Sequence, residues 1–337
     1  MPAKSIPISD LEVGTVMSTH IRYFTGGLIA IPVDDGGYVV GPAGLAIDEP
    51  RYLGPFPFED VCSLASQAGC YYVGCNEILA SAGPERSEFW YPHIGNTGAA
   101  EHSADSWAGV AFQAEEAGDD DSSRIARHLS ISMASASRRL RDVALLLNQQ
   151  LEWAVRRQRA SGSRYSNTAI HDLYLAVHSL LAEMCSARDY LSQLAAKRVG
   201  AKASTDNLAR LQNWLSKAAN ADSREDALVK LIQGAAGTEA DPGWLTQLSD
   251  LRNQITHRQP LGANPEAAAL LYQQVATSSG SIPRIRLARF KRGQEVADGE
   301  DTFVMLLRYW LALERLSQDS VPWAPYGAEH PHFVEGK

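Results

Sequence analysis

Residues 241–260 read DPGWLTQLSDLRNQITHRQP, and this stretch predicts one helix of about four to five turns. Asp241 is a residue type that caps helix N-termini, and Pro242 suits the first helical position. Pro260 ends the helix, because a proline in a helix interior removes a hydrogen bond and clashes with the preceding turn. The stretch therefore contains residue types that are typical of both ends of a helix.

The apolar and polar side chains of this helix separate onto different sides. At about 100° per residue the apolar side chains gather mostly on one side. They are Trp244, Leu245, Leu248, Leu251 and Ile255. Asn253 and His257 share another side, since they are four residues apart, and Arg252 lies at the margin of the apolar stripe. The pattern predicts that a guanidinium, a carboxamide and an imidazole emerge together beside a buried seam.

The spacing of arginine and histidine is a weak pattern by itself. With 24 Arg and nine His, an Arg followed by a His after four to six intervening residues is expected about twice by chance. The chain contains three instances, which are Arg86 with His93, Arg164 with His171 and Arg252 with His257. Only the third lies within one continuous predicted helix and has Asn directly after the Arg. The candidate site is therefore sought there.

The stretch Leu251–His257, LRNQITH, resembles the R-N-x-x-x-H signature of HEPN domains. These are helical domains, many of which act as metal-independent RNA endonucleases in toxin–antitoxin, abortive-infection and other antiviral systems. The resemblance covers about residues 122–320, where the predicted order of helices also agrees. It implies RNA as substrate, no metal or other cofactor, and a 2′,3′-cyclic phosphate product. It also implies a homodimer in which the first long helix and the motif helix bring two Arg/His pairs to a shared cleft.

The chemistry of RNA cleavage suits these residue types. His257 is assigned to general acid/base work, because an imidazole has an unperturbed pKa of about 6.5. Arg252 is assigned to the phosphate, because its planar guanidinium matches two non-bridging oxygens. Asn253 either orients the imidazole or contacts the phosphate. The 2′-hydroxyl is the nucleophile, so RNA is expected to be cut and DNA spared.

Further basic residues are candidates for substrate binding. The segment 284–292 holds five positive charges in nine residues, which suits contacts with a phosphate backbone. Arg258, Arg284 and Arg286 are assigned to substrate binding.

Other interpretations of the same residues stay open. Arg252 beside an apolar seam also suits a packing or ion-pair role, and His257 in the last turn also suits the negative end of a helix dipole. The alternative function is a non-catalytic HEPN-like module that binds RNA, a nucleotide or a partner protein. An antitoxin or a sensor is a further partner that the resemblance suggests.

Charge and composition divide the chain into four parts. Residues 1–121 contain four basic and 18 acidic residues, a net charge of −14, whereas 122–320 contain 26 and 19, a net charge of +7. The predicted parts are a β-containing acidic domain at 1–93, an acidic linker at 94–121, a helical domain at 122–320 and a tail at 321–337. The linker is either a solvated tether or an acidic segment that blocks a basic groove.

The periodicity of apolar residues predicts the elements. Short strands in hairpins are expected within 20–47, and a short helix and a strand at 58–73. Two long helices are expected at about 122–159 and 166–198, packed as an antiparallel pair. After further short helices, a helix at 264–275, a strand at 284–290 and a helix at 302–316 are expected. The predicted fold class is mainly α, a HEPN-type helical bundle with a smaller β-containing N-terminal domain.

The four cysteines are predicted to be buried free thiols rather than zinc ligands. A zinc site of Cys62, Cys70, Cys75 and His93 is conceivable, but irregular spacing without a C-x-x-C pair favours buried free thiols. No apolar run reaches the length of a bilayer span, and residues 1–14 lack an apolar signal core. The expected location is the cytoplasm, with no membrane contact and no metal.

Overall fold

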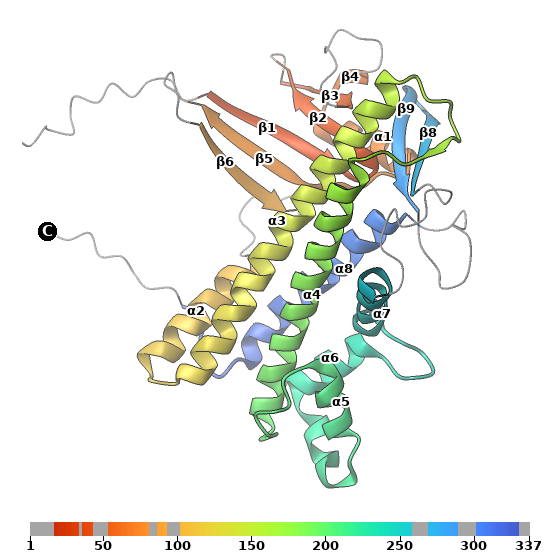
Figure 1. Cartoon of the computed structure of the whole chain (residues 1–337). Helices are drawn as coiled ribbons and strands as arrows, with labels where there is room; N and C mark the ends of the chain where they lie inside the picture. Colours follow the sequence, from red (N-terminus) through yellow and green to blue (C-terminus); the bar gives the residue numbers. More distant parts are fainter. Residues whose placement is uncertain are drawn as a thin grey trace, which may run out of the picture.

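A long antiparallel helix pair runs through the molecule (Figure 1). The computed structural model describes residues 17–33, 36–42, 53–80, 86–92, 102–257, 269–288 and 301–329. Helix α3 spans Asp120–Arg156 and α4 spans Ile170–Arg198. Their apolar residues recur every three or four positions, so each helix buries a continuous stripe against the other. The predicted pair of long antiparallel helices is confirmed.

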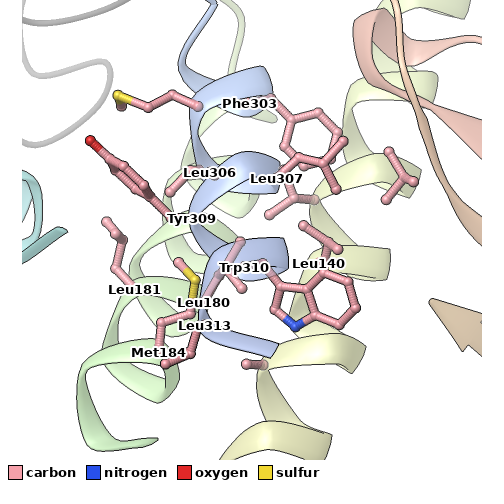
Figure 2. Packing of buried hydrophobic residues seen from close by; sticks show 14 of the residues in the cluster. Leu140, Leu180, Leu181, Met184, Phe303, Leu306, Leu307, Tyr309, Trp310 and Leu313 are labelled. Atoms are coloured by element: carbon pink, nitrogen blue, oxygen red, sulfur yellow. The ribbon is translucent and has the colours of Figure 1, made fainter. Parts of the chain in front are cut away.

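The C-terminal helix α8 completes the core of this pair. It spans Thr302–Ser320, four residues beyond the predicted end. In Figure 2 α8 packs against both α3 and α4; the labelled residues are Phe303, Leu306, Leu307, Tyr309, Trp310 and Leu313 of α8, Leu140 of α3, and Leu180, Leu181 and Met184 of α4. Trp310 and Phe303 are among the largest fully buried side chains. The three helices therefore share one apolar interior.

A six-stranded antiparallel sheet covers one end of α3 (Figure 1). Its order is β4-β3-β2-β1-β5-β6. The strands are β1 Met17–Phe24, β2 Ile29–Pro32, β3 Tyr38–Gly41, β4 Leu53–Phe56, β5 Tyr72–Ala80 and β6 Arg86–Pro92. A 3-10 turn, η2 Thr25–Gly27, joins β1 to β2, and helix α1 spans Phe58–Gln67. The predicted hairpins and the short helix are confirmed.

The sheet and the helices meet through specific contacts. Trp90 of β6 donates from Nε1 to Ser137 Oγ of α3 at 3.1 Å. Asn148 of α3 donates from Nδ2 to the backbone oxygen of Gly27 at 2.7 Å. Gly27 has a φ of 80° and lies directly against the backbone of Leu147, so a side chain at this position has no room. The turn is thus fitted closely to the helix.

A second, three-stranded antiparallel sheet lies within the region predicted to be helical. Its order is β7-β8-β9, with β7 at Arg164–Tyr165, β8 at Leu270–Thr277 and β9 at Gly280–Leu287. The predicted helix at 264–275 is wrong for residues 270–275, which pair with β9 from Leu270↔Leu287 onward. Residues 264–268 lie outside the described residues. The predicted strand at 284–290 is confirmed through residue 287, and it begins earlier, at 280.

The predicted fold class is wrong. The chain is an α+β protein with two antiparallel sheets, not a helical bundle that carries a smaller β domain. Strands β7, β8 and β9 belong to the region expected to be helical. One hydrophobic core also contains residues of both parts, from Tyr23 in β1 to Leu316 in α8. The sheet cannot bury its apolar face alone, so it packs on α3 rather than standing apart.

Helix α2, Ser103–Glu116, occupies half of the predicted acidic linker at 94–121. Trp107 is fully buried and donates from Nε1 to the backbone oxygen of Ser317 in α8 at 3.2 Å. Acidic residues after this helix pair with neighbouring basic ones, as Asp119 does with Lys197 at 2.9 Å and Asp121 with Arg124 at 2.7 Å. Residues 103–121 are therefore neither a solvated tether nor an acidic segment that blocks a basic groove. Both predictions are wrong for this part of the chain.

Short helices lie beside α4 (Figure 1). They are α5 Leu208–Leu215, the 3-10 helix η3 Ala218–Glu225, α6 Ala227–Ala236 and α7 Trp244–His257. Helices α5 and α6 lie near the end of the pair away from the six-stranded sheet, and α7 lies nearer the middle of the pair. The motif helix α7 begins at Trp244, so the predicted cap at Asp241 and Pro242 is wrong. Pro242 instead forms a β-bridge with Gly237.

The last described segment, 321–329, begins with a 3-10 turn, η4 Val321–Trp323. Tyr326 in this segment donates from its hydroxyl to Asp119 at 3.3 Å. Among the helices of the described residues, none combines the length and apolar character needed to cross a bilayer.

Candidate functional site

Helix α7 positions the residues of the R-N-x-x-x-H sequence. Its apolar seam is buried as predicted, with Leu245 and Leu248 fully enclosed and Ile255 only 1% exposed. The seam packs chiefly on α4, and Tyr309 of α8 donates from its hydroxyl to Gln247 at 3.1 Å. Packing on α4, α6 and α8 fixes both the position and the rotation of α7. The polar side of the helix is thereby held in one orientation.

Arg252 and Asn253 emerge beside this seam. Arg252 is half-buried, Asn253 is exposed, and Arg252 Nη1 donates to Asn253 Oδ1 at 3.2 Å. His257 is the last residue of α7, one turn after Asn253, and its side chain lies outside what the structure describes. Arg258 also lies outside the described residues. The structure therefore places two of the three predicted catalytic side chains together.

A cavity of about 430 Å³ opens between α4, α5 and α7, and Arg252 and Asn253 both line it. The lining has an apolar part and a polar part. The apolar part is Ala182, Cys185, Leu208 and Ala209. The polar part is Ser186, Arg188, Asp189, Asn207, Gln212, Thr246, Ser249, Arg252 and Asn253. Two of the three predicted catalytic residues thus lie at a concave region of the surface whose lining is partly polar and partly apolar.

An ion pair on α4 is hydrogen-bonded to the other two walls of the cavity. Arg188 donates to Asp189 Oδ1 from Nη2 at 2.9 Å, and its Nη1 donates to the hydroxyl of Ser249 in α7. The same Asp189 oxygen accepts from the backbone N–H of Leu208, the first residue of α5, at 3.2 Å. One arginine therefore ties α4 to α7 and one carboxylate ties α4 to α5. The cavity is a preorganised feature of three helices.

Positive charge exceeds negative charge at the cavity. Two guanidinium groups, Arg188 and Arg252, line it against the single carboxylate of Asp189. Burial raises the pKa of the Cys185 thiol, and the neighbouring Arg188 lowers it only in part. Cys185 is therefore a neutral thiol in the apolar part of the lining, and the net charge favours an anionic group such as a phosphate.

The predicted substrate-binding residues Arg284 and Arg286 do not line the cavity. Arg284 lies in β9, where its guanidinium donates to the backbone oxygen of Ala68 and, from Nη2, to Gln273 Oε1 at 2.8 Å. It joins the second sheet to the end of α1. Arg286 is half-buried near the carboxylate of Asp301. Arg284 is therefore engaged in contacts within the fold, and neither arginine lines the cavity beside Arg252.

The structure describes the three cysteines that were considered as zinc ligands, but not the histidine. Cys62, Cys70 and Cys75 are free thiols, and burial raises the pKa of Cys70 to about 12. His93 lies outside the described residues. Within the described part of the chain, no group of three or more His, Cys, Asp or Glu side chains is arranged to hold a metal ion.

Local sequence patterns missed Arg188, Asp189, Asn207 and Ser249. Arg188 and Asp189 lie inside a predicted long helix, where charged neighbours are common and carry no indication of a site. The contacts of Arg188 and Asp189 with α7 and α5 exist only in the folded chain.

Comparisons of this chain with protein-family models, with curated proteins and with solved structures give no match.

Proposed function

We propose that this protein is a metal-independent endoribonuclease that cleaves RNA by attack of a ribose 2′-hydroxyl. The observation that carries the proposal is that Arg252 and Asn253 line one cavity together with Arg188 of α4. Arg252 and Asn253 lie on α7, whose last residue is His257. The resemblance of 251–257 to the HEPN signature supplies the reaction class. The excess of guanidinium groups supports a phosphodiester as the ligand.

In this proposal Arg252 binds the non-bridging oxygens of the scissile phosphate and stabilises the charge that develops there. His257 transfers the protons: the nucleophilic 2′-hydroxyl loses one, and the leaving 5′-oxygen gains one. Asn253, which accepts a hydrogen bond from Arg252, holds the guanidinium in place. Attack by the 2′-oxygen breaks the P–O5′ bond and leaves a 2′,3′-cyclic phosphate.

The proposal includes a homodimer and a cellular setting. In a dimer that joins two α7 helices at one cleft, a histidine from each chain serves as acid or base on opposite sides of the scissile bond. The proposed setting is the cytoplasm, where the four free thiols stay reduced and RNA is abundant. A toxin or antiviral effector controlled by an antitoxin or sensor partner is the role that the resemblance suggests.

The test is incubation of the purified chain with total cellular RNA in EDTA, beside Arg252→Ala and His257→Ala variants. Circular dichroism first establishes that all three proteins are folded. Cleavage by the parent protein and its loss in both variants is the expected result. A folded parent that binds RNA and leaves it uncut would identify a binding module instead. Addition of Mg²⁺ or Mn²⁺ in place of EDTA shows whether a metal is required.

A further inference from the structure

We infer that the cavity between α4, α5 and α7 receives a single unpaired nucleotide of an RNA strand, beside the phosphate that Arg252 binds. This inference rests on the proposed function and adds the form of the substrate. The enzyme then acts on single-stranded RNA, and the cavity lining sets its base preference.

The size and lining of the cavity fit a nucleobase. Its volume of about 430 Å³ lies within the range of about 300–1,000 Å³ that small-molecule sites occupy. A base has two apolar faces and a polar edge. Ala182, Leu208 and Ala209 provide an apolar contact area for a face of the base.

Two side-chain amides of the lining are available to contact the edge of the base. In the described part of the chain, the side-chain amide of Gln212 and the Nδ2 of Asn253 make no hydrogen bond with another residue. Both residues line the cavity and both are exposed. An amide presents donors and an acceptor, which is what the Watson–Crick edge of an unpaired base requires. A base within a duplex has this edge occupied and does not leave the stack without cost.

A strand rather than a free nucleotide is the occupant that the geometry favours. Ala209, Gln212 and Asn253 on the lining are exposed, so the cavity opens to solvent at α5 and α7. Sites for free small molecules usually enclose most of the ligand surface. An open cavity instead allows the sugar–phosphate backbone to enter and leave on either side of the bound base.

The test measures binding separately from cleavage. The probes are short fluorescent 2′-fluoro homopolymers of each base, which lack the nucleophilic 2′-hydroxyl, and a 2′-fluoro duplex of the same length. The variant is Ala209→Trp, which places an indole in the cavity. The matched control is Asn213→Trp, since Asn213 is an exposed residue of α5 that does not line the cavity. Fluorescence anisotropy gives the affinity of the full chain, and circular dichroism verifies its folding.

The parent protein is expected to bind at least one homopolymer about tenfold or more tightly than the duplex. Ala209→Trp is expected to weaken that binding about tenfold, and Asn213→Trp to change it by less than about twofold. Equal affinity for strand and duplex, or no effect of Ala209→Trp, would overturn the inference. Displacement of the strand by an equal concentration of free mononucleotide would also overturn it. If Ala209→Trp does not fold, Gln212→Ala decides, because unchanged affinity for all four homopolymers would exclude base contacts in the cavity.

These results separate the two proposals. RNA cleavage that Ala209→Trp leaves unchanged would support the endoribonuclease and reject the nucleotide cavity. No cleavage of natural RNA, together with the expected binding pattern, would reject the endoribonuclease and leave a cavity that binds unpaired nucleotides.

Discussion

Arg188 of α4 and Arg252 of α7 line one cavity from two helices that pack together, yet within the described residues only Arg188 is paired with a carboxylate. Among the described residues, the partner of the Arg252 guanidinium is the neutral amide of Asn253. Arg188 therefore serves to connect the walls, while the charge of Arg252 is not compensated within the described part of the chain.

We expect Arg252→Lys to lower the rate of RNA cleavage by about 10²-fold, because an ammonium group cannot bind two phosphate oxygens in a fixed plane. The Michaelis constant should change much less, since the loss falls mainly on the transition state. Single-turnover and steady-state kinetics measure both. Arg210→Lys on α5 is the matched control, because Arg210 is exposed and pairs with Asp206 outside the cavity lining. Equal rates for the two variants would contradict the role of Arg252.

We expect His257→Ala protein to inhibit the parent protein in mixed dimers, because a cleft that takes its acid and its base from different chains is incomplete when one histidine is missing. After random exchange of equal amounts, about one quarter of the dimers have two parent chains, so the rate should fall to about half of that of the same amount of parent protein alone. The measurement is cleavage after co-refolding, with light scattering to record mass. A monomeric mass, or an unchanged rate after co-refolding, would show that no shared cleft forms.

Asp301, the N-cap of α8, should make stability fall between about pH 4 and pH 6. Its carboxylate accepts from the backbone N–H groups of Phe303 at 2.9 Å and Leu287 at 3.3 Å, yet desolvation raises its pKa to about 6. The folded state therefore binds this proton more tightly than the unfolded state, and the free energy of unfolding decreases as pH rises through this range. Solvent at the partly exposed residue reduces the effect to about 1–2 kcal/mol.

Asp301→Asn tests this expectation, because an amide oxygen still caps the helix and does not ionise. Urea unfolding at several pH values should show the variant gaining stability relative to the parent from pH 4 to pH 6. Asp319→Asn, at an exposed position near the other end of α8, is the control. A parallel pH dependence of parent and Asp301→Asn would rule out the titration of Asp301 in this range.

Trp107→Ala should lower the free energy of unfolding by about 3–5 kcal/mol, the usual cost of removing a large buried aromatic side chain. The indole is fully buried between α2 and α8, and the loss also leaves the Ser317 backbone oxygen without its 3.2 Å hydrogen bond. Phe112→Ala, at a half-buried position of the same helix, should cost clearly less. The midpoint of urea unfolding gives both values. A loose connection at 103–116 would instead make both substitutions nearly neutral.

The long elements were predictable from sequence because their apolar periodicity extends over many turns. Leu129, Met133 and Leu140 recur on one side of α3, and no short-range alternative accommodates such a stripe. Helix α2 was missed because its many Ala, Ser, Gly and acidic residues are typical of linkers. Trp107, Val110 and Ala114 were spaced as a helix requires, and that spacing was the indication to follow.

The second sheet and the cavity were not predictable in the same way. Strand β8 begins with Leu270 and Leu271, adjacent apolar residues that a buried helix also contains, and its partner β9 had to be known first. Arg252 and Asn253 were found because a motif names them. Arg188 and Asp189 belong to the site only through the packing of α4 on α7 and α5, which no local pattern encodes.

Because α8 packs on both α3 and α4 and completes their shared core, the nascent chain cannot reach its native state from the N-terminal side alone. A ribosome adds about 5–20 residues per second. The apolar side chains of α3 and α4 that α8 covers therefore stay exposed until residue 320 has left the exit tunnel. Maturation of the cavity is thus coupled to completion of translation through α8. Truncated products that end before this helix should remain unfolded and inactive.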